Sequence, residues 1–395
     1  MNARRVLIIV ENLPVPFDRR VWQEATTLRD AGYEVSVICP KGDDAASSHE
    51  VLDGIHVYRH PMPFEASGAL GYVVEYASAV AFEFALAWRV LVGRGFDAIH
   101  ACNPPDLIFL VGGFFKLFGK RFLFDHHDIN PELYEAKFGR RDMLYRVMLL
   151  LERLTFRLAD VSIATNESYR TIALERGRMM PDRVFVVRSG PDPKRMKQVP
   201  PDPLLKRGRT FLVGYVGVMG KQEGIDLLLE AARHIVHTRD RRDVHFGLAG
   251  SGPELAALQS LARRLDVGDH VTFTGRIPDS ELLTLLCTAD VCVNPDRVNA
   301  MNDKSTMNKI MEYMALGKPI VQFETTEGRI SAQQASVYAR ANDPVDFADK
   351  IVELLDDPDR RRRMGEFGLQ RLNDELQWCH EAPKLLAAYD KLFAR

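Results

Sequence analysis

The sequence predicts an α/β protein built from two doubly wound domains that face each other across a cleft. At 395 residues the chain is long for a single hydrophobic core. Short apolar runs rich in β-branched residues alternate with helical periods, and this rhythm starts twice, near residues 6 and 212. A repeated strand–helix–strand pattern is typical of parallel sheets that are covered by helices on both faces.

Each series of predicted strands has the size of one Rossmann-like domain. We therefore expect a first domain over residues 1–190, a second over 191–375, and a last helix over 376–395 that stands alone or packs back onto the first domain. The first series of strands covers residues 6–10, 34–39, 98–101, 122–124, 161–164 and 184–187. The second series covers residues 212–217, 244–247, 271–274, 291–294 and 320–322.

Composition and charge exclude several classes of protein. Lys and Arg number 52 against 54 Asp and Glu, and this balance argues against a nucleic-acid binder. The five cysteines include no CxxC pair, so neither zinc spacing nor a disulfide framework is indicated, and a cytoplasmic location fits best. The apolar stretch 107–121 ends in Lys120 and Arg121. It is either a buried core helix or an interfacial helix that makes peripheral contact with a membrane.

Residues 303–319, DKSTMNKIMEYMALGKP, carry the strongest signal for a ligand. Ser305 or Thr306 can cap a helix whose free N–H groups bind a diphosphate. Lys309 and Glu312 stand three residues apart and therefore share one helical face. The Glu312 carboxylate can accept hydrogen bonds from both vicinal hydroxyls of a ribose. A surface ion pair between Lys309 and Glu312 is the alternative.

Other candidate residues follow predicted strands, where ligands bind in such sheets. The loop GVMGKQEG has glycines, including Gly217 and Gly220, that allow a backbone to cradle phosphate, although such turns also simply start a helix. The segment FDHHDINPELY places two adjacent histidines between two aspartates, but adjacent histidines suit one metal ion poorly, so no metal site is expected. The remaining candidates in the first domain are Asn103 and Asp106 as polar groups of the cleft and Arg19 as a ligand for an anionic group.

These segments, taken in order, resemble the retaining glycosyltransferases of family 4, which have the GT-B fold, and a subset of them from bacterial surface-polysaccharide pathways. EYMALGKPIV matches the family signature, so Glu312 is implied to bind ribose. The other glutamate of the family's Glu-x7-Glu motif, which touches the donor sugar, is replaced by Lys304, and Asp303, one residue off register, is the candidate to substitute for it. Val218 and Glu223 stand where the family has an Arg and a Lys on the diphosphate, which leaves Lys221, Lys309 or backbone amides to balance that charge.

The resemblance also implies roles for the other loops. His127 contacts a donor-sugar hydroxyl near the reacting carbon, Asp128 and Glu132 line the same loop, and the loops of Gly250 and Arg276 border the nucleoside. The implied reaction moves a sugar, with retention and without a metal or other cofactor, from a nucleotide-sugar to a glycan or lipid-linked hydroxyl. A catalytically silent nucleotide-sugar-binding subunit and another GT-B enzyme, such as a sugar-nucleotide 2-epimerase, stay open as alternatives.

Overall fold

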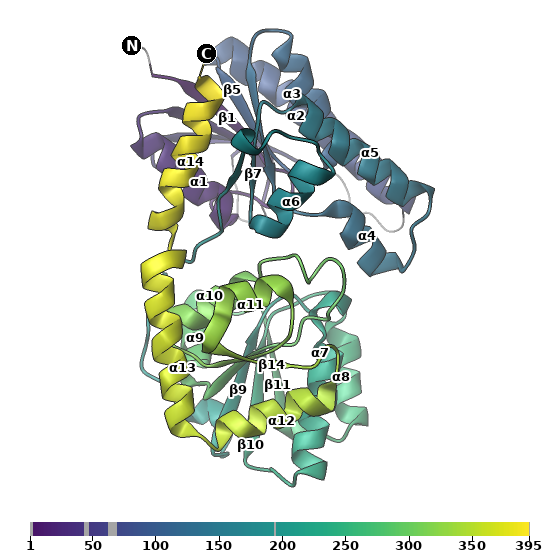
Figure 1. Cartoon of the computed structure of the whole chain (residues 1–395), viewed down its shortest axis with the longest axis vertical. Coiled ribbons are helices and arrows are strands. Elements are labelled where there is room, and N and C mark those ends of the chain that lie inside the picture. Colours follow the sequence, from purple (N-terminus) through teal and green to yellow (C-terminus); the bar gives the residue numbers. More distant parts are fainter. Residues whose placement is uncertain (1–2, 43–46, 62–68, 193–194, 395) are drawn as a thin grey trace. The chain divides into compact units, whose positions relative to one another are not determined.

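The computed structural model describes residues 3–42, 47–61, 69–192 and 195–394. The chain forms two compact units (Figure 1). Unit 1 consists of Met1–Ser189 and Trp378–Arg395, and unit 2 consists of Gly190–Gln377. Each unit is built around one sheet, and the two sheets are described separately below.

The sheet of unit 1 has eight strands in the order β3-β4-β2-β1-β5-β6-β7-β8. Every pair of neighbours is parallel except β3 and β4, which form an antiparallel hairpin at one edge. The six strands predicted for this unit are confirmed to within two residues at each end, whereas the hairpin was not predicted. The strands are β1 Arg5–Ile9, β2 Glu34–Pro40, β3 His49–Leu52, β4 Ile55–His60, β5 Ala98–Cys102, β6 Arg121–His126, β7 Val161–Ala164 and β8 Val184–Val186.

Helices cover the sheet of unit 1, and the C-terminal helix is one of them. Leu385, Ala388 and Tyr389 of this last helix are buried in the same core cluster as residues of β1, β2, β5, β6 and β7. Figure 1 shows the helix, in yellow, running beside that unit. The helices are α1 Arg19–Asp30, α2 Ala69–Gly93, α3 Phe109–Lys116, α4 Asn130–Phe138, α5 Met143–Leu158, α6 Glu167–Glu175 and α14 Trp378–Phe393.

The sheet of unit 2 is parallel throughout, in the order β11-β10-β9-β12-β13-β14, with a buried core on both faces. The order reverses between β9 and β12, which is where doubly wound sheets bind their ligands. The strands are β9 Phe211–Val216, β10 Val244–Ala249, β11 Val271–Gly275, β12 Val291–Asn294, β13 Ile320–Phe323 and β14 Ser336–Ala339. The helices are α7 Ile225–Arg233, α8 Leu255–Arg264, α9 Asp279–Thr288, α10 Asn308–Ala315, α11 Thr326–Ala332, α12 Pro344–Leu355 and α13 Pro358–Arg371.

Two glycines let the loops at this reversal approach one another closely. Gly224 has φ of 63°, and a Cβ there would lie 2.0 Å from the carbonyl oxygen of Pro295, which follows β12. Gly250 has φ of 140°, and its Cβ would lie 1.8 Å from the carbonyl oxygen of Gly217, which follows β9. Side chains rarely tolerate either condition, so glycine is required at both positions.

The apolar stretch 107–121 combines features of both expected alternatives. It forms a short 3-10 turn over Asp106–Ile108, then α3, and it ends where β6 begins. Val111 and Phe115 are buried in the core, while Leu110, Leu117 and Phe118 are exposed. In the part of the chain that the structure describes, we find no helix with the length and hydropathy needed to cross a bilayer.

Candidate active site

A buried ion pair organises the carboxyl edge of the sheet in unit 1. Arg20, in the first turn of α1, donates from Nη2 to Asp125 Oδ1 at 2.9 Å and from Nε to Asp125 Oδ2 at 3.1 Å. Its Nη1 donates to the Val187 carbonyl at 2.7 Å. Burial on its own would raise the pKa of Asp125, but the charges of Arg20 and His127 hold that pKa well below its ordinary value. Asp125 is therefore an ionised carboxylate whose orientation Arg20 fixes.

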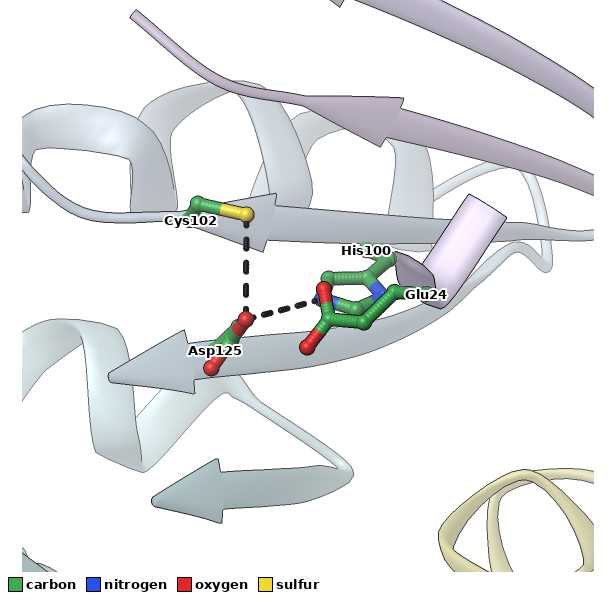
Figure 2. A group of neighbouring side chains, drawn as sticks. All are labelled: Glu24, His100, Cys102 and Asp125. Atoms are coloured by element: carbon green, nitrogen blue, oxygen red, sulfur yellow. Dashed lines mark hydrogen bonds and ion pairs between the residues drawn. The ribbon is translucent and has the colours of Figure 1, made fainter. Parts of the chain in front are cut away.

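Four buried side chains of metal-binding type meet at this ion pair. Glu24 comes from α1, His100 and Cys102 come from β5, and Asp125 comes from β6 (Figure 2). One possible ligand atom of each lies within 4.8 Å of the others. Arg20 already lies in this group, because its Nε is 3.2 Å from Glu24 Oε1 as well as being bonded to Asp125. The guanidinium therefore supplies the positive charge that balances these carboxyls.

His127 is held from both its side chain and its backbone. Its Nε2 makes a short contact with Asp125 Oδ2, and its side chain is 14 % exposed. Its backbone N–H donates to Asn103 Oδ1 at 2.7 Å. Asn103 Nδ2 in turn donates to the Asp128 carbonyl at 2.7 Å and to Asp106 Oδ1 at 2.9 Å. Asn103 thus clamps the loop after β6 and brings His127, Asp128 and Asp106 together.

The other residues singled out in this unit have different surroundings. Burial raises the pKa of Asp128, and burial together with the charge of Glu152 raises the pKa of Asp106 to about 6. Glu132 accepts from Arg176 Nη1 at 2.7 Å, so its carboxylate is committed to an ion pair. This partner argues against Glu132 as a catalytic acid or base.

Arg20, the neighbour of Arg19, is the arginine that is buried against Asp125. Arg19 was the residue expected to meet an anionic group, but its side chain is exposed at the start of α1, whereas Arg20 is buried against Asp125. Adjacent helical residues point about 100° apart, so only one of the two can face the sheet. One feature of the sequence indicates such a partner. Asp125 stands in an otherwise apolar strand, and a buried carboxylate needs a cation nearby.

In unit 2 the central feature is Lys309, which lies between two carboxyls where the strand order reverses. Lys309 Nζ lies 2.5 Å from Glu223 Oε2 and 2.9 Å from Asp296 Oδ1, and its side chain is 10 % exposed. The ammonium also lies 5.0 Å from the centroid of the Tyr215 ring. Lys309 therefore contacts residues that follow β9 and β12, and not Glu312 as in the alternative of a surface ion pair.

The three charges of this cluster influence one another. Burial and the neighbouring charge of Glu223 raise the pKa of Asp296 to about 7, although Lys309 opposes the shift. Burial would also raise the pKa of Glu223, but Lys309 outweighs it and the pKa falls below its ordinary value. Below pH 7 the cluster is therefore close to neutral, and above it the cluster gains one negative charge.

Glu312, one turn along α10 from Lys309, is paired with an arginine from the start of unit 2. Arg195 Nη1 lies 3.0 Å from Glu312 Oε1. The same guanidinium binds Asp279, with Nε 2.5 Å from Oδ2 and Nη2 2.9 Å from Oδ1. No local pattern in the sequence predicts roles for Arg195 and Asp279, since their partners are distant in the chain.

The predicted helix cap before α10 is wrong. The helix begins at Asn308 after Met307, whose side chain makes no capping hydrogen bond. Ser305 Oγ instead donates to the Met301 carbonyl at 2.9 Å, and Thr306 lies in the loop before the helix. Asp303, considered as a contact to the donor sugar, accepts from the Thr326 backbone N–H at 2.8 Å and from its hydroxyl at 3.0 Å. It therefore supports the start of α11.

The remaining candidates of unit 2 lie on the loops around the reversal point. Lys221 and Arg276 have exposed side chains, and Gly220 is buried. Lys304 lies in the turn after Asp303, and its N–H donates to the Met301 carbonyl at 3.1 Å. Gly217 and Gly250 form the close approach described above.

Each of the two units matches a known protein family. Residues 18–190 match a family described as glycosyl transferase 4-like domain, and residues 210–357 match glycosyl transferases group 1. Together the two matches cover most of the chain. This chain is a family 4-like glycosyltransferase. Enzymes of this kind take their sugar from a nucleotide-sugar.

Individual relatives align over different shares of this glycosyltransferase. It is 28 % identical to an α-D-kanosaminyltransferase of Streptomyces kanamyceticus over 39 % of each chain. It is 24 % identical to an MMP α-(1→4)-mannosyltransferase of Mycolicibacterium hassiacum over 93 % of this chain and 92 % of the relative.

Solved structures confirm the predicted GT-B fold. Sucrose-phosphate synthase from Thermosynechococcus elongatus superposes with a TM-score of 0.79 at 19 % identity, over 99 % of both chains. HepE of Anabaena in complex with UDP-glucose gives a TM-score of 0.73 at 15 % identity, over 98 % of this chain and 99 % of the other.

Replacing Arg20 by Gln is expected to destabilise unit 1. Without the guanidinium, the ionised Asp125 is left buried without its main cation, which costs about 3–5 kcal/mol of unfolding free energy. Urea unfolding measures the change, and Arg19→Gln, which removes an exposed arginine from the same helix, is the control. Equal stability of the two variants would show that Arg20 does not balance these carboxyls.

Proposed function

We propose that this enzyme transfers a hexosyl group, with retention and without a bound metal, from a nucleoside-diphosphate sugar to a hydroxyl of a glycan or lipid-linked acceptor. In the family resemblance this reaction belongs to bacterial surface-polysaccharide synthesis. The observation that carries the proposal is the pair of functional groups on α10, the Lys309 ammonium and the Glu312 carboxylate, at the carboxyl edge of a doubly wound sheet.

Unit 2 is proposed to hold the nucleotide and the diphosphate. Glu312 accepts hydrogen bonds from the ribose hydroxyls, and the loops of Gly250 and Arg276 border the nucleoside. Lys309 faces the diphosphate together with the loop of Gly217 and Gly220. Glu223 stands where the family has a lysine, and here its carboxylate contacts the Lys309 ammonium at 2.5 Å. The proposal is that a cation supplied by α10 replaces the one that the loop lacks.

His127 of unit 1 is proposed to contact the donor sugar. As the anomeric carbon–oxygen bond breaks, negative charge develops on the diphosphate, and fixed positive groups lower the energy of that transition state. The acceptor oxygen forms the new bond on the same face, and its proton passes to an oxygen of the leaving phosphate. Asn103, Asp106 and Asp128 belong to the clamp that fixes the His127 loop, and Arg19 stays a candidate for the acceptor side.

Replacing Glu312 by Ala is expected to lower kcat/KM about 100-fold without unfolding the protein. The estimate follows from losing hydrogen bonds to a charged acceptor, each of which contributes about 1.5–3 kcal/mol. The assay measures transfer of labelled sugar, with circular dichroism to check the fold. The control is Asp279→Asn, which alters the other carboxylate that Arg195 binds. An equal loss in the control would mean that both carboxyls serve to hold Arg195, and the ribose assignment would be wrong.

The affinity for the donor is expected to fall as pH rises through about 7. Asp296, whose pKa is raised to about 7, is neutral below that value and adds a negative charge near the diphosphate above it. By linkage, the donor KM should rise by up to about tenfold between pH 6 and pH 8. Asp296→Asn should flatten this profile. A wild-type donor KM that is constant between pH 6 and pH 8 would show that the charge of Asp296 does not affect donor binding.

We further propose that unit 1 touches a membrane through an apolar and basic face on α2, α3 and α5. These helices are neighbours, because the Trp88 and Phe118 rings lie 5.7 Å apart and Lys116 Nζ donates to the Leu158 carbonyl at 2.7 Å. The only acidic residue of α5, Glu152, is buried, so the exposed charges of that helix are positive. The exposed apolar side chains are Trp88, Val92, Leu110, Leu117, Phe118, Met143, Val147 and Leu150, and the exposed arginines are Arg89, Arg121, Arg146, Arg153 and Arg157.

Such a face suits an anionic bilayer, which attracts arginines and accepts apolar side chains. The wild-type protein is expected to sediment with vesicles that contain phosphatidylglycerol and not with pure phosphatidylcholine vesicles. Leu117→Ser should reduce the bound fraction several-fold. Leu204→Ser is the matched control, since Leu204 of unit 2 is 80 % exposed against 82 % for Leu117. Equal sedimentation of both variants and the wild type would contradict the assignment of this face.

A further inference from the structure

A chain of buried polar contacts links the C-terminal helix α14 to His127. Tyr389 Oη lies 2.9 Å from His100 Nδ1. On the other side of the ring, His100 Nε2 lies 3.4 Å from Asp125 Oδ2. The same carboxylate oxygen contacts His127 Nε2. Tyr389, His100 and Asp125 are fully buried, so water does not compete for these contacts.

Tyr389 and Asp125, on opposite sides of the ring, together favour one tautomer of His100. Burial raises the pKa of Tyr389, so the phenol keeps its proton and can donate it. Burial lowers the pKa of His100, so the imidazole is neutral and has one N–H. When the Tyr389 hydroxyl donates to Nδ1, the proton of His100 must be on Nε2. That N–H then points at Asp125, as Figure 2 shows for the contact between the two side chains.

The Asp125 carboxylate passes this constraint on to His127. Oδ1 is taken by Arg20 Nη2 at 2.9 Å, and Oδ2 faces Arg20 Nε, His100 Nε2 and His127 Nε2. Arg20 Nε also lies 2.8 Å from His127 Nε2, so the guanidinium and the Asp125 carboxylate hold this nitrogen together. With Nε2 held there, the orientation of the imidazole ring is fixed. If His100 instead presented a lone pair to Asp125, the carboxylate would be repelled from its position beside His127.

Glu24 is the other carboxyl group beside His100. It is a weaker acceptor for the His100 N–H than Asp125. Its Oε2 lies 3.6 Å from His100 Nε2, farther than Asp125 Oδ2. Burial and the charge of Asp125 raise the pKa of Glu24 well above its ordinary value, so Glu24 holds a proton while Asp125 is ionised. The negative charge that faces the His100 N–H is thus that of Asp125.

We propose that Tyr389 and His100 are positioning residues for sugar transfer, acting through Asp125 to fix the orientation of His127. This inference rests on the proposed contact between His127 and the donor sugar. It gives α14 a role in turnover besides its packing in the core of unit 1.

The test combines kinetics with NMR of histidine side chains labelled with ¹⁵N. Tyr389→Phe removes one hydroxyl and keeps the ring. It should lower kcat about tenfold and change the donor KM less than about twofold, because a misplaced group costs rate more than binding. In the unliganded protein, the ¹⁵N shifts of His100 should move away from those of a pure Nε2–H tautomer, and the shifts of His127 should move with them.

The matched control lies on the same helix. Trp378 Nε1 donates to Thr27 Oγ1 at 2.8 Å, so Trp378→Phe also removes a hydrogen bond between α14 and unit 1 but leaves the Tyr389 contact intact. It should leave kcat and both sets of shifts unchanged. If the control lowers kcat as much as Tyr389→Phe does, general docking of α14 is responsible and the inference fails. Unchanged His127 shifts in Tyr389→Phe would overturn it as well.

A pair of His100 variants keeps the test decisive if Tyr389→Phe is unstable. The amide of His100→Gln can occupy the place of Nε2–H and donate to Asp125, whereas His100→Leu cannot. The Gln variant should retain the His127 shifts and most of kcat, and the Leu variant should lose both. The opposite order would refute the inference. Because the tautomer is measured without substrate, an error in the proposed reaction would not hide this result.

Discussion

The site in unit 1 depends on the ion pair between Arg20 and Asp125. The guanidinium joins α1 to β6 and to the segment after β8, through Asp125, the Val187 carbonyl at 2.7 Å and the Ser189 hydroxyl at 3.4 Å. Buried ion pairs contribute little net stability compared with well-packed apolar side chains. What this pair provides is position, because a carboxylate with both oxygens engaged cannot rotate. Because His127 contacts this carboxylate, the position of the His127 side chain is fixed as well.

Unit 2 meets a similar constraint with different residues. Lys309 lies between Glu223 and Asp296, which come from separate loops at the carboxyl edge of the sheet. A buried ammonium requires both carboxyls to stay near it, and two carboxyls that share one cation cannot both ionise easily. The raised pKa of Asp296 is the consequence. In each unit a buried cation therefore joins loops or helices that are distant in the sequence.

The sequence predicted the sheets well and the contacts of the site poorly. Parallel strands buried on both faces are short apolar runs, which is why β7 and β12 were predicted with their observed bounds. The hairpin of β3 and β4 was missed, since β3 lies at the sheet edge and is only partly buried. The partner of Arg20 stands 105 residues away, and no local pattern distinguishes Arg20 from Arg19. The cap predicted at Ser305 failed because the helix starts later, after Met307.

The charge cluster around Lys309 gives a structural reason why this chain differs from the family motif at a charged position. When the sequence is compared with the family motif position by position, Val218 and Glu223 replace two cationic residues and Lys304 replaces a glutamate. The structure shows that Glu223 and Lys309 are not independent, because each is the buried partner of the other. Removing Lys309 alone would leave Glu223 and Asp296 without their shared cation, so the acid in the loop depends on the base on α10. A charge cluster of this kind is better compared with those of relatives by the side chains that meet in space than by the residue types in one loop.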